Sequence, residues 1–298
     1  MKILVLGSIC LDMIVDIDEL PKLNEDVNTN DLNLSLGGMA YNVYNVIKLF
    51  KEDVILGSVI GEGVIANIVS DLLAIRNDKP IGVIKGQDNG LCICLVDKSK
   101  ERSFISHHGA EYRFNQDFFK DINFEEVSYI YVSGLEIEDV DGLKIIEFLE
   151  KVRKPIFFAP GPRVDKINPA YLKRLYDLKP ILHINEREAL LISNLDNLNE
   201  AVNVISDLIH NLVIVTLGEK GTLYKEYQKD IKLIETTKVE MLDATGAGDN
   251  HAGATLAMLN KANTVEESIK VANKVAAAVV KQKGASLDED NFKAAINL

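Results

Sequence analysis

Short apolar runs recur along the chain at intervals that leave room for a helix between them. Residues 3–7 form the first run, and 129–132, 155–158, 181–184 and 212–215 form later ones. These runs are short and apolar on both faces, which is typical of strands in a parallel sheet covered by helices on either side. The pattern therefore predicts an α/β fold with a mainly parallel sheet flanked by helices.

The segments between these runs carry apolar residues at helical spacing. The first such segment has a stripe that holds Val43, Val46 and Ile47. Asn42 lies off that stripe, near the start of the expected helix. Thr264 begins a Thr-x-x-Glu capping box at the start of a late helix. We expect helices over 40–50, 139–152, 168–177, 199–210, 252–259 and 264–281.

Four further segments predict a second, smaller sheet. Residues 13–18 and 32–36 alternate apolar with polar side chains. Residues 91–96 and 103–106 are expected to pair as strands that 97–102 connects. The chain has no repeat, no low-complexity tail and no proline-rich linker, so we expect one domain.

Composition and charge narrow the function classes. The formal net charge is −12 at pH 7, which argues against a broad nucleic-acid-binding surface because such surfaces are basic. Hydrophobic residues make up 47% of the chain, yet no apolar run is long enough to cross a membrane. The N-terminal segment is too short and strand-like for a secretory signal, and three cysteines without paired spacing argue against a disulfide framework or a zinc site. We therefore expect a cytoplasmic protein with no membrane or nucleic-acid partner.

Residues 243–253 carry the most specific chemical pattern, Asp-Ala-Thr-Gly-Ala-Gly-Asp-Asn-His-Ala-Gly. Gly246, Ala247 and Gly248 precede an apolar helical run, so their amides would crown a helix start that attracts phosphate. Asp249 places a carboxylate beside this cradle, as phosphoryl transfer to a hydroxyl requires. The alternative is an ordinary glycine-rich helix start with an aspartate near its cap. No Lys-Ser or Lys-Thr pair follows, so the pattern is not a Walker A loop, and its C-terminal place excludes a dinucleotide fingerprint.

This motif resembles the C-terminal motif of the ribokinase-like (PfkB) superfamily of sugar and nucleoside kinases. Four other segments resemble motifs of that family in the same order, namely the first strand with its aspartate, the Gly-Gly pair, the Asn-x-x-Glu motif and the nucleotide loop. They are residues 6–12, 37–42, 185–188 and 216–221. The resemblance implies a three-layer ribokinase-like kinase domain over residues 1–298, with a small β-sheet lid formed by about 12–36 and 88–107.

The resemblance implies an ATP- and magnesium-dependent kinase for a primary hydroxyl of a small sugar, as in ribokinases and fructokinases. Asp249 would be the catalytic base, and Gly246, Ala247 and Gly248 would form the anion cradle. A nucleoside kinase, including one for pseudouridine, is the nearest alternative, because the same scaffold can hold a ribose that carries a base. A catalytically weak sugar- or nucleotide-binding regulator is an alternative from another class, and the intact Gly-Ala-Gly-Asp sequence argues against it.

The other site residues are carried over from the family motifs one by one. The acceptor, a small sugar or nucleoside, is expected to contact Asp12, Gly37, Gly38, Asn42 and Glu136. ATP is expected to contact Asn185, Thr216, Gly218, Gly221 and Asn273. Glu188 is expected to order water bound to Mg²⁺. Without the resemblance, Asp12 is a turn residue, Asn42 a helix cap and Glu188 a solvated partner of Arg187.

A monovalent cation is a further expectation from the resemblance. Asp243 and Thr245 resemble positions that help hold potassium in ribokinase-like members, with carbonyl oxygens of 282–286 as additional ligands. Such an ion would offset charge beside the cradle and fix its geometry. Alternatively, the ammonium group of Lys281 or Lys283 fills that space and makes the ion unnecessary.

Two other expectations concern assembly and one unusual residue. The open edges of the lid sheet favour a homodimer through the lid, because an exposed edge needs a covering partner. His251 stands where the family usually has phenylalanine. We interpret it first as a packing or hydrogen-bonding residue and second as a titrating group.

Overall fold

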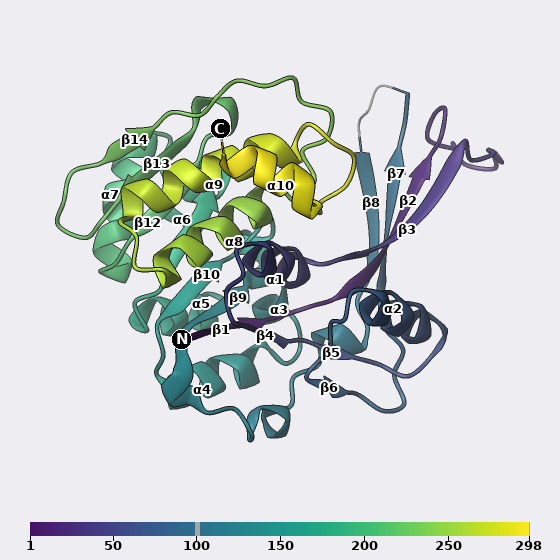
Figure 1. Cartoon of the computed structure of the whole chain (residues 1–298), viewed down its shortest axis with the longest axis horizontal. Coiled ribbons are helices and arrows are strands. Elements are labelled where there is room, and N and C mark those ends of the chain that lie inside the picture. Colours follow the sequence, from purple (N-terminus) through teal and green to yellow (C-terminus); the bar gives the residue numbers. More distant parts are fainter. Residues whose placement is uncertain (99–101, 298) are drawn as a thin grey trace.

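Residues 1–98 and 102–297 are described by the computed structural model. A large sheet lies at their centre, with the strand order β14-β13-β12-β11-β10-β9-β1-β4 (Figure 1). Neighbours from β12 to β4 run parallel, whereas β12–β13 and β13–β14 are antiparallel. The strands are β1 (Lys2–Leu6), β4 (Val54–Gly57), β9 (Val127–Ser133), β10 (Ile156–Ala159), β11 (Ile181–Asn185), β12 (Val213–Thr216), β13 (Thr222–Lys225) and β14 (Lys232–Ile234).

Helices cover both faces of this sheet, which gives the three layers of an α/β fold (Figure 1). On one face lie α1 (Met39–Leu49), α8 (Ala247–Asn260), α9 (Val265–Val279) and α10 (Glu289–Ile296). On the other lie α4 (Gly142–Val152), α5 (Pro169–Asp177), α6 (Glu186–Ser193) and α7 (Leu198–Ile209). Apart from short 3₁₀ turns and a second sheet described below, the other elements are α2 (Val64–Ile75), α3 (Gly134–Glu138) and a short parallel pair, β5 (Val59–Ile60) with β6 (Gly82–Val83).

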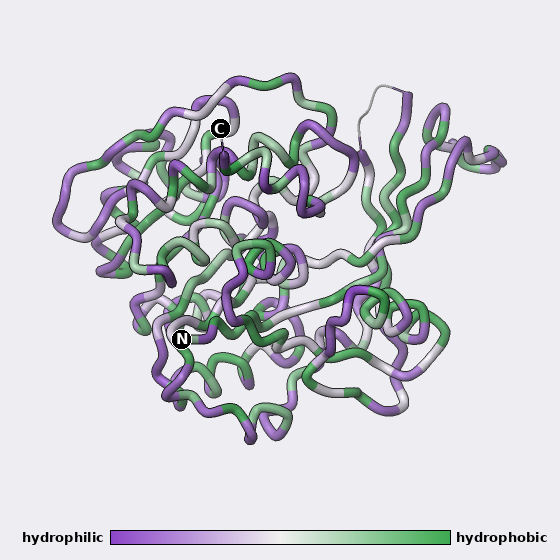
Figure 2. Tube along the Cα trace, in the orientation of Figure 1, coloured by the Kyte–Doolittle hydropathy of each residue, from purple (hydrophilic) through white to green (hydrophobic). Residues whose placement is uncertain are grey.

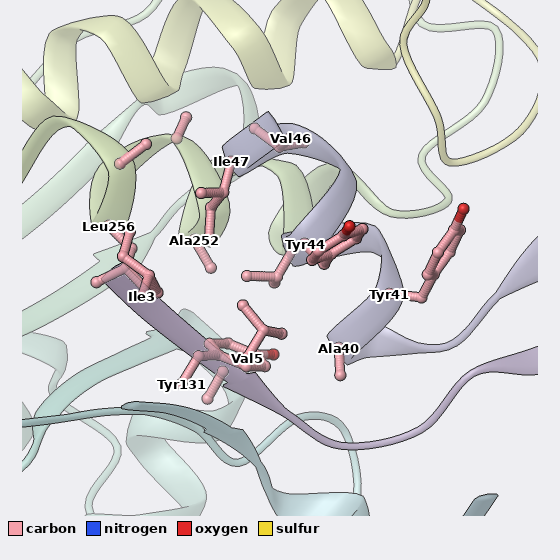
Figure 3. Close-up of a cluster of buried hydrophobic side chains, with 14 of the residues drawn as sticks. Ile3, Val5, Ala40, Tyr41, Tyr44, Val46, Ile47, Tyr131, Ala252 and Leu256 are labelled. Atoms are coloured by element: carbon pink, nitrogen blue, oxygen red, sulfur yellow. The ribbon is translucent and has the colours of Figure 1, made fainter. Parts of the chain in front are cut away.

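Side chains of the central strands alternate between two separate apolar cores. Ile3 and Val5 of β1 point toward α1 and α8, where they meet Ile47 and Leu256 (Figure 3). Leu4 lies in the core on the opposite face. Strands buried on both faces explain why the sequence shows continuous apolar runs there. The predicted α/β fold with a mainly parallel, helix-flanked sheet is confirmed.

Two expected helix boundaries differ from the structure. Helix α4 begins at Gly142, three residues after the expected start at residue 139, because the chain turns after α3, where the Gly142 amide donates to the Asp139 carbonyl at 2.9 Å. Gly142 permits this turn, since a Cβ there would lie 2.0 Å from the Ile137 carbonyl oxygen. Helix α8 begins at Ala247, five residues before the apolar run at Ala252 that indicated it.

The predicted small sheet is present and stands to one side of the body (Figure 1). We call it the lid. Its strand order is β3-β2-β7-β8, with β2 and β7 parallel and the other pairs antiparallel. The strands are β2 (Cys10–Asp16), β3 (Asp31–Gly37), β7 (Leu91–Val96) and β8 (Arg102–His107). Arg102 belongs to β8 and not to the expected connection 97–102, of which 99–101 lie outside the described residues.

Hydropathy follows this architecture along the chain trace. Hydrophobic segments gather in the central strands and the helix faces against them, whereas hydrophilic residues concentrate in the outer loops and at the ends of the lid strands (Figure 2). Within residues 1–98 and 102–297, no helix is long and apolar enough to cross a membrane.

Helices α1 and α8 pack closely against each other at Gly253, and this contact positions the candidate site. Gly253 of α8 faces α1, where a Cβ would lie 2.9 Å from the Val43 carbonyl oxygen and 3.1 Å from the Val46 Cβ. One turn before Gly253, Asp249 accepts a hydrogen bond at 2.9 Å from Asn42 of α1. The missing side chain at Gly253 therefore lets two residues far apart in sequence meet.

Substitution Gly253→Ala should lower the free energy of unfolding by about 1 kcal/mol. Overpacking the helix contact costs about 1–3 kcal/mol, whereas the higher helix propensity of alanine stabilises the fold by only about 0.8–1.0 kcal/mol. Urea denaturation followed by circular dichroism measures this change. Gly248→Ala is the matched control in the same helix, because no atom lies within 4 Å of its added Cβ. If Gly253→Ala is as stable as Gly248→Ala, the close approach does not constrain the two helices.

Candidate active site

Cavities lie along the edge of the sheet where the parallel strands end, and three of them are lined by expected site residues. The lid cavity, 220 Å³, lies between the lid and the loops that contain Thr245 and Ala285. The central cavity, 310 Å³, is lined by Gly246, Asp249 and Asn185, among others. The outer cavity, 240 Å³, lies between the turn after β12 and helix α9. Ligand sites of parallel α/β sheets lie at this edge.

The start of α8 separates the lid cavity from the central cavity. Gly246 is the N-cap with a φ of 72°, and a Cβ there would lie 2.4 Å from the Ala285 Cβ. The Asn250 amide donates to the carbonyls of Gly246 and Ala285, both at 2.7 Å, and so ties this turn to the C-terminal loop. The first amides of a helix lack intrahelical acceptors, so this turn offers fixed donors to an anion.

Asp249 lies in the first turn of α8 and lines the central cavity. The pKa of its carboxyl is raised to about 7, mainly by burial and further by the negative charges of Glu136, Asp12 and Glu188. The hydrogen bond from Asn42 acts in the opposite direction, because it stabilises the charged form. A carboxyl group with a pKa near neutrality can exchange a proton at physiological pH.

The expected acceptor residues Asp12, Gly37 and Gly38 are brought together at the base of the lid. Asp12 lines the lid cavity, and a Cβ on Gly37 would overlap its carboxylate, 2.0 Å from Oδ2. Burial raises the pKa of the Asp12 carboxyl to about 6. Gly38 has a φ of 100° and begins α1, with no room for a Cβ against the Ser8 carbonyl oxygen at 2.6 Å. The Gly-Gly pair thus makes space for Asp12 on one side and for the chain after β1 on the other.

Glu136 is placed differently from the other expected acceptor residues. Its side chain is 2% exposed and accepts hydrogen bonds from the Ser8 amide at 2.8 Å and from the Ser133 hydroxyl. It therefore holds the turn after β1 against α3. Glu136 lies near enough to Asp249 for its negative charge to raise the pKa of that carboxyl.

Asn185 and Glu188 form a capping box at the start of α6 and line the central cavity. The Asn185 side chain accepts from the Glu188 amide at 2.9 Å, and Glu188 accepts from the Asn185 amide at 3.1 Å. Glu188 is 5% exposed, and burial raises the pKa of its carboxyl. It is therefore not the solvated partner of Arg187 that the sequence also allowed.

Thr216, Gly218, Gly221 and Asn273 all line the outer cavity, as expected for residues of one ligand site. Thr216 also lines the central cavity, so the two cavities adjoin. Gly221 has a φ of 98°, and a Cβ there would lie 2.1 Å from the Ile234 carbonyl oxygen. Asn273 is 5% exposed, and its amide donates to the carbonyls of Ile234 and Glu235. Asn273 thus also supports the wall of the cavity.

His251 belongs to a buried network between the central and outer cavities. Its ring nitrogens lie 2.8 Å from His183 Nε2 and 3.0 Å from the Thr222 hydroxyl, and Asn273 Oδ1 is 3.1 Å away. Burial lowers the pKa of His251 to about 4, so the ring is neutral near pH 7. The hydrogen-bonding interpretation of this residue fits the structure. His183 was missed in the sequence because it lies within an apolar strand run.

Asp243 and Thr245, the expected cation ligands, both accept hydrogen bonds from Arg102 of the lid. Neither Lys281 nor Lys283 fills this position, and Lys283 instead pairs with Asp16 at 3.2 Å. Sequence patterns missed Arg102 because it follows a polar connection, where an arginine is ordinarily solvated. The alternation of side chains along the strand that Arg102 begins was the signal that could have placed it on the face of the lid that lines the cavity.

Comparison with known proteins assigns the family. A model of the pfkB family carbohydrate kinases matches residues 1–291, and the chain belongs to that family. The protein is therefore an ATP-dependent kinase of the ribokinase-like superfamily.

Individual relatives are distant in sequence but similar along their whole length. The chain is 27% identical to "Uncharacterized sugar kinase YegV" of Escherichia coli K12, over 95% of this chain and 89% of the relative. The ribokinase structure from Thermotoga maritima has a TM-score of 0.81 at 23% identity and covers 99% of each chain. Arabidopsis thaliana ribokinase, complexed with ribose and ATP, has a TM-score of 0.80 at 17% identity, over 100% of this chain and 99% of that one.

Proposed function

We propose that this kinase transfers the γ-phosphoryl group of ATP to a primary hydroxyl of a small sugar, with Asp249 as the general base. The observation that carries this proposal is the place of Asp249. Its carboxyl has a pKa of about 7, belongs to the first turn of α8, and lies at the junction of the central cavity and the residues beneath the lid.

The reaction needs three groups to meet at this junction. The acceptor oxygen attacks the γ-phosphorus, the bond to the ADP oxygen breaks, and the hydroxyl proton passes to the Asp249 carboxylate. The amides of Ala247 and Gly248 stabilise the charge on the transferring group, because a helix start presents fixed N–H donors and a partial positive charge. No covalent intermediate with the protein is required.

The acceptor is proposed to lie under the lid with its primary hydroxyl toward Asp249. Asp12 accepts hydrogen bonds from sugar hydroxyls, and the Asn42 side chain holds the Asp249 carboxylate in place. Asn42 Oδ1 is buried without a partner among the described residues, so it can accept from a sugar hydroxyl. Glu136 acts through the turn after β1 and not by contact, since its carboxylate is enclosed.

ATP is proposed to span the outer and central cavities. Its base and ribose lie between the Gly218–Gly221 turn and α9, and its phosphates run past Thr216 toward α8. Asn185 and Glu188 face the phosphates from the start of α6. This orientation follows from the shared wall of the two cavities at Thr216 and Gly248.

The buried carboxylate of Glu188 fits an indirect role with Mg²⁺. Asn185 donates two hydrogen bonds to it, and a carboxylate has about four acceptor sites, so it can also accept from water on the metal. Magnesium retains most of its water and is held largely by nucleotide phosphates. When bound, the ion would neutralise phosphate charge in a protein whose formal net charge is −12.

Substitution Asp249→Asn should lower kcat by ~10²–10⁴-fold, because an amide cannot accept the proton. The measurement is ADP release with a panel of pentoses, hexoses and nucleosides, together with ADP affinity by calorimetry, which should remain unchanged. Asp207→Asn, on the exposed face of α7, is the matched control and should keep wild-type turnover. Near-wild-type turnover in Asp249→Asn would exclude this residue as the base. A nucleoside that exceeds every sugar in kcat/KM would exclude the sugar assignment.

The pH dependence of kcat/KM should show one group that must be deprotonated, with a midpoint near pH 7. Burial raises the folded-state pKa of Asp249, so the carboxylate is lost as pH falls through about 7, and the rate falls tenfold per unit below it. Asn42→Ala should move this midpoint to higher pH, because the amide hydrogen bond favours the charged form. If Asn42→Ala leaves the midpoint unchanged, the group that titrates is not Asp249.

We also propose that two copies associate through the outer face of the lid, away from the lid cavity. Met13, Ile93 and Ile105 lie in register across the sheet and form one apolar row on that face, whereas Leu34, which is in register with Met13, packs against the main core. Ile105 is 60% exposed, at a strand that forms a sheet edge. Exposed apolar rows at an open edge are typical of surfaces that another chain covers.

Substitution Ile105→Glu should convert the dimer to a monomer in sedimentation velocity, because a charge would be buried in the apolar row. Phe104→Glu is the matched control, since Phe104 is the neighbouring residue on the opposite face and is also exposed. A wild-type protein that is monomeric at all concentrations, or equal behaviour of the two variants, would contradict this interface.

A further inference from the structure

The carboxylate of Asp243 is held by three elements at once. Its Oδ1 accepts from the Thr245 amide at 2.7 Å and from the Arg102 guanidinium, and its Oδ2 accepts from the Gly284 amide at 2.8 Å. The same Arg102 nitrogen also contacts the Thr245 hydroxyl. Three of about four acceptor sites of this carboxylate are therefore in use.

The neighbouring carbonyl oxygens are engaged as well. Ala285 accepts the Asn250 side-chain amide at 2.7 Å, and Ser286 accepts the Gln282 side-chain amide at 2.6 Å. A dehydrated potassium ion is held by a shell of such oxygens. In this conformation the two side chains expected to bind a monovalent cation, Asp243 and Thr245, are bound by Arg102, and its guanidinium stands where the positive charge would be.

Arg102 is suited to replace a cation at this position. Its guanidinium remains charged at all relevant pH values, and its side chain is 20% exposed beside an Asp243 side chain that is 2% exposed. Burial alone raises the pKa of Asp243, but the hydrogen bonds from Arg102, Gly284 and Thr245 outweigh it and lower the pKa to about 2.

The origin of Arg102 distinguishes it from a bound ion. Arg102 is the first residue of β8, at the edge of the lid, whereas Asp243 and Thr245 lie in the loop that leads directly into Gly246 and the amide cradle. In this structure the guanidinium reaches this loop from the lid, at the wall of the lid cavity that Arg102, Asp243 and Thr245 all line. A free ion would bind whether the lid were open or closed.

We propose that Arg102 is a positioning residue that supplies the positive charge beside the phosphate cradle in place of a monovalent cation, and that it couples lid closure to the geometry of the cradle. This inference rests on the proposed function of residues 246–249. Its consequence is a kinase that is independent of potassium. Arg102 itself touches no reacting atom and acts through Asp243 and Thr245.

The first arm of the test needs no acceptor. Thallium(I), a spectroscopic substitute for potassium, is added to the wild-type protein and to Arg102→Ala, and its bound fraction is followed by thallium NMR with potassium as competitor. We expect no potassium-displaceable thallium on the wild-type protein and a bound ion on Arg102→Ala, where the oxygen atoms of Asp243 and Thr245 are released. Thallium on the wild-type protein that potassium displaces would overturn the proposal.

The second arm measures turnover with ATP and the fastest acceptor of the panel, in potassium, sodium or tetramethylammonium chloride at one ionic strength. Wild-type kcat should be equal in all three salts. Arg102→Ala should lose ~10- to 100-fold in kcat, the range expected for losing hydrogen bonds to a charged group. Potassium, or guanidinium at a non-denaturing concentration, should restore much of this loss, and Arg102→Lys should retain more activity than Arg102→Ala.

Lys98→Ala is the matched control, because Lys98 is a lid cation that pairs with Asp18 at 2.9 Å and has no contact with the cradle loop. It should keep the wild-type kcat and the same indifference to salt. Wild-type kcat in Arg102→Ala, or a loss that neither cation nor Arg102→Lys repairs, would overturn the proposal. If no acceptor gives ADP release, the proposed function fails, and the thallium arm still decides the role of Arg102.

Discussion

The hydrogen bond from Asn42 to Asp249 is the contact on which the rest of the site depends. It joins α1, which follows the lid strand β3, to α8, whose start forms the amide cradle, at a distance of 2.9 Å. The bond is possible because Gly253 places no side chain against Val43 and Val46 of α1, so the two helices approach closely at this point. One contact thereby fixes the acceptor side of the site against the phosphate side.

Electrostatics gives this junction its chemical character. Asp12, Glu136 and Glu188 surround Asp249 with negative charge. Together with burial, this charge raises the pKa of the Asp249 carboxyl to about 7. Glu136 can remain buried because the Ser8 amide and the Ser133 hydroxyl hydrogen-bond to it. The positive counterpart comes from the helix start and, in our proposal, from Arg102. A chain with a formal net charge of −12 thus builds an anion site from local donors.

Much of this arrangement was predictable from the sequence because it is local. Strands such as 129–132 are apolar on both faces, and the 243–249 motif contains its own turn and helix start, so both predictions needed no distant partner. The close approach at Gly253, the capture of Asp243 by Arg102 and the pairing of His183 with His251 could not be predicted. Each joins residues from different elements, and nothing in a single segment signals its partner. The start of α4 was expected three residues too early because Asp139 and Asp141 both suit an N-cap, and the sequence alone does not say that Asp141 takes that position.

The central claim is that Asp249 and the start of α8 together receive the acceptor hydroxyl and the γ-phosphate. A crystal structure with a non-hydrolysable ATP analogue and the fastest acceptor of the panel tests it most directly. The account predicts a primary hydroxyl within about 2.6–3.2 Å of an Asp249 carboxylate oxygen. It also predicts the γ-phosphate on the amides of Ala247 and Gly248. An acceptor hydroxyl beside another carboxylate, or a γ-phosphate away from α8, would contradict the account.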